Sequence, residues 1–127
     1  MDRSEIMRRI RSKETKPEVA LRKLLWRCGC RGYRKNWGRP SVDVAFTRRK
    51  VAVFLDSCFW HGCPEHFRLP KTRPEWWAAK MAANRERDAR ATRTWEERGW
   101  TVLRYWTHAP LNVIAASVME ILRLMDG

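Results

Sequence analysis

Carboxylates stand at positions in the sequence where predicted strands and helices would hold them in place. Asp43 lies inside a predicted strand, Asp56 ends the next strand, and Glu18 lies early in the first predicted helix. Mg²⁺ prefers oxygen ligands and keeps several waters, so one or two carboxylates and the phosphate oxygens of a substrate can hold it. Each aspartate taken alone could equally cap a turn. Taken together, the three predict a metal site suited to phosphodiester chemistry.

A second group of potential ligands follows Asp56. Residues 58–66 contain two cysteines and two histidines, and a third histidine follows the last predicted strand. Structural zinc is closed by four thiolate or imidazole ligands, and a loop with few core residues gains order from such a metal. The predicted zinc ligands are Cys58, Cys63, His66 and His108. This choice leaves His61 for proton transfer, although the spacing alone also allows two free cysteines and surface histidines.

The chain is strongly basic. It has 27 Lys and Arg against 14 Asp and Glu, a formal net charge of +13, and the cations are spread along its whole length. Such a surface favours a polyanionic partner, but charge alone does not separate an enzyme from a non-catalytic nucleic-acid binder. No apolar stretch approaches the roughly 18 residues of a membrane span, and the charged residues 1–16 do not read as a signal peptide. We therefore expect a cytoplasmic, nucleoid-associated protein.

The order of the predicted elements indicates an α/β sandwich with a mixed central sheet. Strands at 42–46 and 51–55 form a hairpin, and β-branched residues favour a buried strand for 51–55. The other predicted elements are a helix from Thr15 to near Gly29, a strand around 32–35, a long charged helix from 72 to about 98 ended by Gly99, a strand at 100–106 and a helix from Pro110. Because the sequence contains no repeat or linker, residues 1–127 should form one domain.

Several motifs occur in a fixed order along the chain. Residues 11–18 read Arg-Ser-Lys-Glu-Thr-Lys-Pro-Glu, 40–46 read Pro-Ser-Val-Asp-Val-Ala-Phe, 58–61 read Cys-Phe-Trp-His, and 69–73 read Leu-Pro-Lys-Thr-Arg. Their residue types, order and spacing resemble the very short patch repair endonucleases, the Vsr-type DNA mismatch endonucleases. The likeness continues through Asn84-Arg-Glu-Arg-Asp88 and covers about residues 3 to 108.

The resemblance implies a restriction-endonuclease-like three-layer sandwich with a structural zinc site. It also implies that Asp43 and the backbone carbonyl of Leu55 bind Mg²⁺. Glu18 matches a helix glutamate that orders metal-bound waters, and His61 matches a histidine that acts near the attacking water. Asp56 stands where some members have a histidine, so three roles stay open: binding a metal, orienting His61, or tuning the local field.

The same resemblance implies how DNA would be read. Phe59, Trp60 and Trp77 match a wedge inserted from the major groove beside the mismatch, and Met7 matches a residue that enters from the minor groove. The arm at residues 1–14 would contact DNA, as would Lys71, Arg73, Lys80 and Asn84. We expect Phe59, Trp60 and Trp77 to be exposed aromatics among cations, suited to stacking on bases, and whether Trp76 or Trp77 faces DNA stays open. For Trp26, Trp100 and Trp106 we expect core positions.

The function implied is Mg²⁺-dependent, strand-specific nicking of duplex DNA at T:G mismatches. A T:G pair is weakly stacked, so opening it costs less than opening a matched step. One alternative is a nickase of the same fold with another target, linked to a mobile element or a restriction system. Another is a non-catalytic, zinc-stabilised DNA-binding module, which would not need Glu18, Asp43 and His61 together. We expect a monomer, with mismatch-repair proteins as further candidate partners and no membrane contact.

Overall fold

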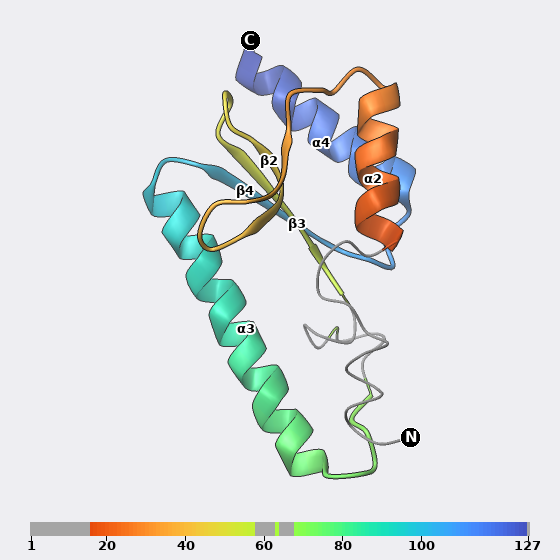
Figure 1. The fold of residues 1–127 in the computed structure, drawn as a ribbon, viewed down its shortest axis with the longest axis vertical. Helices are drawn as coiled ribbons and strands as arrows, with labels where there is room; N and C mark the ends of the chain where they lie inside the picture. Colours follow the sequence, from red (N-terminus) through yellow and green to blue (C-terminus); the bar gives the residue numbers. More distant parts are fainter. Residues whose placement is uncertain (1–15, 58–62, 64–67, 127) are drawn as a thin grey trace.

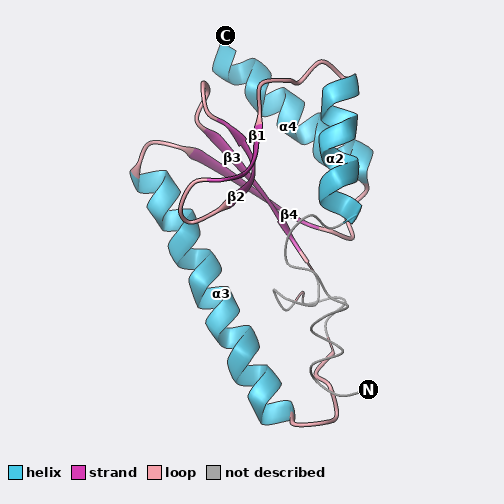
Figure 2. Ribbon diagram, viewed as in Figure 1, coloured by secondary structure: helices cyan, strands magenta, loops and turns pink. Residues whose placement is uncertain are grey.

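The fold is an α/β sandwich in which a four-stranded sheet separates one long helix from two shorter ones (Figure 1). The structure is a computed structural model and describes residues 16–57, 63 and 68–126. In Figure 2 the helix α3 lies on one side of the strands, and α2 and α4 lie on the other. The elements are α2 (Lys16–Arg27), β1 (Arg34–Trp37), β2 (Val42–Phe46), β3 (Val51–Asp56), α3 (Pro74–Glu97), β4 (Thr101–Trp106) and α4 (Leu111–Asp126).

The sheet is mixed, as the sequence predicts. Its strands follow the order β1-β2-β3-β4. The first two pairs are antiparallel, with Val44 opposite Val53 in the hairpin of β2 and β3. Strands β3 and β4 are parallel, with Asp56 opposite Trp106. A parallel pair requires a crossover connection, and α3 lies in that connection. The ends of β3 and β4 therefore meet at one edge of the sheet.

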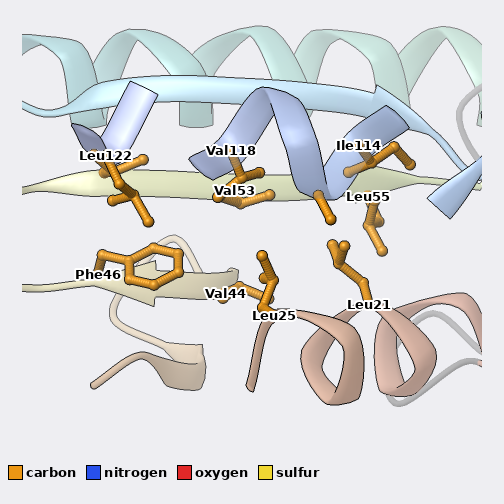
Figure 3. Packing of buried hydrophobic residues seen from close by; sticks show 11 residues of the cluster. Leu21, Leu25, Val44, Phe46, Val53, Leu55, Ile114, Val118 and Leu122 are labelled. Atoms are coloured by element: carbon orange, nitrogen blue, oxygen red, sulfur yellow. The ribbon is translucent and has the colours of Figure 1, made fainter. Parts of the chain in front are cut away.

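Strand β3 is buried on both faces because it runs through the middle of the sandwich. Side chains alternate across a strand, so Val51, Val53 and Leu55 join the core formed with α2 and α4. Figure 3 shows this core, with Leu21 of α2 beside Leu55. Ala52 and Phe54 face the opposite way and pack with Trp95 of α3. Both helical layers are thus held to the sheet through the same strand.

Two helices end through the same hydrogen-bond pattern. Gly29 follows α2 with φ 87°, and Gly99 follows α3 with φ 88°. After α2, the Gly29 and Cys30 amides donate to the carbonyls of Trp26 and Leu25. This is the glycine-based Schellman arrangement, which satisfies carbonyls that the helix itself leaves open. It reverses the chain a few residues before β1, and the equivalent bonds after α3 turn the chain directly into β4.

The predicted hairpin and the long helix are confirmed, whereas the prediction for Trp26 is wrong. Its side chain is 50% exposed. Leu21 and Leu25 share the buried face of α2 because they are four residues apart. Trp26 is one residue further and points out of that face, with the Arg31 guanidinium 4.4 Å from its ring centroid. Trp100 packs partly buried against Trp37 and Trp95, and Trp106 is also partly buried.

The described ranges contain no helix that is long and apolar enough to pass through a bilayer.

Candidate active site

Asp43 and Leu55 meet where the β2–β3 hairpin opens. Asp43 is half-buried near the start of β2, and its Oδ2 accepts a hydrogen bond of 2.8 Å from the Leu55 amide. The next residue of β3, Asp56, directs its backbone carbonyl to the opposite side, toward β4. This carbonyl accepts a bond of 3.0 Å from the amide of Thr107, which follows β4. A strand residue directs its N–H and C=O to the same side. The Leu55 carbonyl oxygen therefore also faces β2 and the Asp43 carboxylate.

Glu18 lies toward the same edge of the sheet. It is in the first turn of α2 and only 2% exposed, which is unusual for a carboxylate. Leu21, one helical turn further on, packs beside Leu55 (Figure 3). The helix therefore begins near the end of β3, and Glu18 lies at its start. A buried carboxylate at this place is consistent with a role beside the hairpin site.

Asp56 forms an ion pair with a residue of β4. Its Oδ1 forms a salt bridge of 2.8 Å with Nη1 of Arg104 on β4. Arg104 is the one charged residue inside the predicted strand 100–106, which is a signal that was available in the sequence. The register of β3 against β4 cannot be read from the sequence. It places Arg104 opposite Phe54, two residues before Asp56.

The oxygen donors at the hairpin fit a hard divalent cation. Mg²⁺ is commonly held by one or two carboxylates plus substrate phosphates, with waters completing an octahedron. Asp43 supplies a carboxylate and Leu55 a backbone carbonyl, so the set resembles that pattern. Within residues 16–57, 63 and 68–126, no group of three or more His, Cys, Asp or Glu side chains could hold a metal ion.

Two of the four predicted zinc ligands lie side by side. Cys63 is buried, and its Sγ lies 3.7 Å from Nδ1 of the exposed His108, which follows β4. A thiolate and an imidazole on one tetrahedral zinc bind at about 2.3 and 2.0 Å, so the two donor atoms are about 3.5 Å apart. The observed separation fits this arrangement. The other two predicted ligands, Cys58 and His66, lie outside the described residues, as does His61.

Cys28 and Cys30 are the other cysteines in the described ranges. Neither Cys28 nor Cys30 forms a disulfide. Burial raises the pKa of the Cys30 thiol, the neighbouring Cys28 raises it further, and Arg49 opposes both effects. Only the thiolate is a good metal ligand. The raised pKa therefore makes the Cys30 thiolate harder to form than an ordinary thiolate.

Three relatives of this chain carry names of one activity class. The sequence profile of the family DNA mismatch endonuclease Vsr matches residues 1–66. The chain belongs to the Vsr family. It is 41% identical over 131 residues to the Type II nicking enzyme V.NaeI of Lentzea aerocolonigenes, covering 98% of this chain and 78% of that protein. The Type II nicking enzyme V.XorIIP of Xanthomonas oryzae is 40% identical, covering 98% and 92%.

A third relative carries the family name itself. The DNA mismatch endonuclease Vsr of Escherichia coli is 35% identical over 106 residues, covering 82% of this chain and 68% of that protein. Membership of the Vsr family makes this chain a DNA endonuclease. The Vsr profile includes the hairpin with Asp43 and Asp56, whereas Arg104 and His108 lie beyond residue 66.

The predicted DNA-contacting side chains of this Vsr family member differ in exposure. Lys71 and Arg73 are exposed, Lys80 is partly exposed, and Asn84 is 7% exposed. The predicted exposure of Trp77 is wrong, because its side chain is 3% exposed.

The phase of α3 explains this burial. Trp77, Met81 and Asn84 are spaced four and three residues apart on the buried face of α3. Trp76 is partly exposed, contacts Trp77 edge to face with centroids 4.7 Å apart, and has the Arg73 guanidinium 6.0 Å from its ring centroid. Met7, Phe59 and Trp60 lie outside the described residues.

Proposed function

We propose that this Vsr family member is a Mg²⁺-dependent endonuclease that nicks one strand of duplex DNA at T:G mismatches. The observation that carries the proposal is the bond from the Leu55 amide to Asp43, which brings the carboxylate to Leu55, whose carbonyl points to the same side of β3 as that amide. The basic surface suits a DNA duplex as substrate. The name of the Escherichia coli relative supports mismatched DNA as the target.

The side chains would divide the work of hydrolysis. Asp43 and the Leu55 carbonyl would hold Mg²⁺, which supplies charge stabilisation to the scissile phosphate when it is bound. Glu18 would accept hydrogen bonds from waters at the site and orient them. His61, left free of zinc, would take a proton from the attacking water. In this arrangement the cation needs no second carboxylate ligand, such as Asp56 of β3.

A second candidate function keeps the chemistry and changes the target. V.NaeI and V.XorIIP are named Type II nicking enzymes, names that specify nicking but not a mismatch. A nickase linked to a restriction system remains the alternative for this chain. The non-catalytic DNA-binding module is set aside, since the chain belongs to a family of endonucleases.

The chemistry can be tested separately from the target. A duplex with a T:G pair, labelled differently on its two strands, is incubated with the protein in Mg²⁺ and in a chelator. We expect one strand to be cut once in Mg²⁺ and neither strand in the chelator. Cutting of both strands, or cutting without a divalent cation, would contradict the proposed metal-dependent nickase.

We further propose a structural zinc held by Cys58, Cys63, His66 and His108. The proposal is supported by the short Cys63–His108 approach, which joins the segment after β3 to the segment after β4. A metal bridging these two segments would tie together the ends of the two parallel strands. In a loop with few apolar residues, binding energy of this kind becomes folding energy.

The zinc proposal predicts that Cys63→Ser releases the metal and lowers the melting temperature by about 10 °C or more, because a structural zinc contributes several kcal/mol to folding. Elemental analysis of the purified protein and a thermal melt measure the two effects. The matched control is Cys28→Ser, since Cys28 is exposed and far from His108 in the chain. Equal zinc content and stability in both variants would remove Cys63 from the site.

DNA binding should weaken steeply as salt increases, because each phosphate neutralised by a cation contributes about −0.9 to the slope of log K against log salt. Arg73→Gln should reduce that slope by about one contact, since Arg73 is exposed at the start of α3. Arg123→Gln is the matched control, because Arg123 is on α4 and already pairs with Glu120 at 2.7 Å. An unchanged slope for Arg73→Gln would exclude this residue from the interface.

A further inference from the structure

Arg104 connects three parts of the fold beside the candidate active site. Besides its salt bridge to Asp56, its Nε donates to Thr92 Oγ1 at 2.7 Å and its Nη2 donates to the Asp88 carbonyl at 2.9 Å. Thr92 and Asp88 are four residues apart, so they lie on one face of α3. All three nitrogens of the guanidinium are therefore used, and they join β4, the end of β3 and α3.

The Arg104 guanidinium also packs against an aromatic ring. Arg104 lies opposite Phe54 in the parallel pair, and its guanidinium carbon is 4.1 Å from the Phe54 ring centroid. Phe54 belongs to the core on the α3 side of the sheet. Because side chains alternate along a strand, Asp56 shares that side, while Leu55 does not. Arg104 therefore binds the Asp56 carboxylate on the face of the sheet that α3 covers.

This geometry separates the two aspartates of the hairpin. The Asp43 side chain belongs to β2, and its carboxylate accepts a hydrogen bond from the Leu55 amide on the side of β3 that faces β2. Asp56 is the adjacent residue along β3, and its carboxylate is held by a side chain of β4. Mg²⁺ demands near-ideal octahedral geometry and keeps several waters. A second carboxylate able to swing toward the cation would displace waters or phosphate oxygens that the reaction needs.

We infer that Arg104 is a positioning residue for nicking: it holds Asp56 against α3, so that Asp43 is the β2–β3 carboxylate that binds the cation. The inference rests on the proposed function. It assigns Asp56 to a fixed salt bridge, which none of the three roles expected from the sequence includes. It also gives α3 a part in shaping the site, through Thr92 and the Asp88 carbonyl.

The test measures Mn²⁺ binding by electron paramagnetic resonance, with Mn²⁺ standing in for Mg²⁺, together with single-turnover nicking on a T:G duplex. Arg104→Met should remove the guanidinium that holds Asp56 and tighten Mn²⁺ binding about five- to ten-fold, since a carboxylate that has lost its cationic partner attracts the metal ion more strongly. The same variant should nick about 10- to 100-fold more slowly, because the cation is displaced from its productive place. Adding Asp56→Asn to Arg104→Met should restore the parent affinity for Mn²⁺.

A neutral variant separates positioning from charge. Thr92→Val removes one anchor of Arg104 without altering any ion, and it should shift both readouts in the same direction, by about two- to three-fold. It also keeps the inference testable if Arg104→Met does not fold. Thr94→Val is the matched control, because Thr94 donates to the Arg90 carbonyl on the exposed side of the same helix. Its readouts should equal those of the parent.

The outcomes distinguish this inference from the proposed function. If parent protein shows no Mn²⁺ binding that Asp43→Asn weakens, the proposed metal site is wrong and the inference falls with it. If that binding is present but Asp56→Asn weakens it as much as Asp43→Asn does, Asp56 is a ligand and only the inference is overturned. Parent-like Mn²⁺ affinity and nicking in both Arg104→Met and Thr92→Val would also overturn it.

Discussion

Replacing Asp43 with asparagine should abolish Mg²⁺-dependent nicking while leaving the fold intact. Asparagine keeps an oxygen that can accept the 2.8 Å bond from the Leu55 amide, so the hairpin loses a charge and keeps this bond. A carboxylate ligand contributes several kcal/mol of charge stabilisation through the metal, and each 1.36 kcal/mol changes the rate ten-fold. The single-turnover rate on a T:G duplex should fall at least about a thousand-fold.

The control for this variant is Glu96→Gln, which removes one negative charge from an exposed position near the end of α3. It should nick at the parent rate. DNA affinity measured in a chelator should be unchanged or slightly higher for Asp43→Asn, because a negative charge leaves the surface that faces phosphate. A parent-like nicking rate for Asp43→Asn would show that the metal site lies elsewhere.

Replacing His61 with alanine should slow nicking by about 10² to 10⁴-fold, the usual contribution of a general base. The metal and the DNA stay bound in this variant, so some cutting should remain. That residual rate should rise with pH, since hydroxide can replace the missing base. Single-turnover rates across a range of pH values, measured on the same T:G duplex, give both quantities.

His108→Ala is the contrasting variant for His61→Ala. His108 lies 3.7 Å from Cys63 and is a predicted zinc ligand, so its loss should lower zinc content and stability. His61→Ala should keep its zinc. If the results are reversed, with zinc lost from His61→Ala and kept in His108→Ala, the set of four ligands has been chosen wrongly.

The sequence predicts the elements of this fold well because their signals are local. The β-branched run that becomes β3 and the two glycines that end α2 and α3 are each read from a few neighbouring residues. The antiparallel hairpin also follows from sequence proximity. Asp43 and Leu55, twelve residues apart, meet across that hairpin through the bond from the Leu55 amide, and their role as metal ligands stays a prediction.

The two predictions that failed concern helix phase, and the contact that was missed depends on strand register. Trp26 and Trp77 each lie on a helix where neighbouring positions differ by about 100°, so a tryptophan beside the apolar stripe can be assigned to either face. The Asp56–Arg104 pair depends on the parallel register of β3 and β4, which are joined through the whole length of α3. No local pattern encodes that register, and Arg104 was therefore missed.

The most direct test of mismatch-directed nicking is the single-turnover rate on duplexes identical except at one base pair. The pair is T:G, T:A or C:G, and each strand carries its own label. Opening a mismatched step costs less by up to a few kcal/mol, which corresponds to a rate difference of about a hundred-fold. We expect the T:G duplex to be nicked on one strand at least that much faster than either matched duplex, in Mg²⁺ only. Equal rates on all three duplexes would contradict mismatch-directed nicking and favour a nickase with another target.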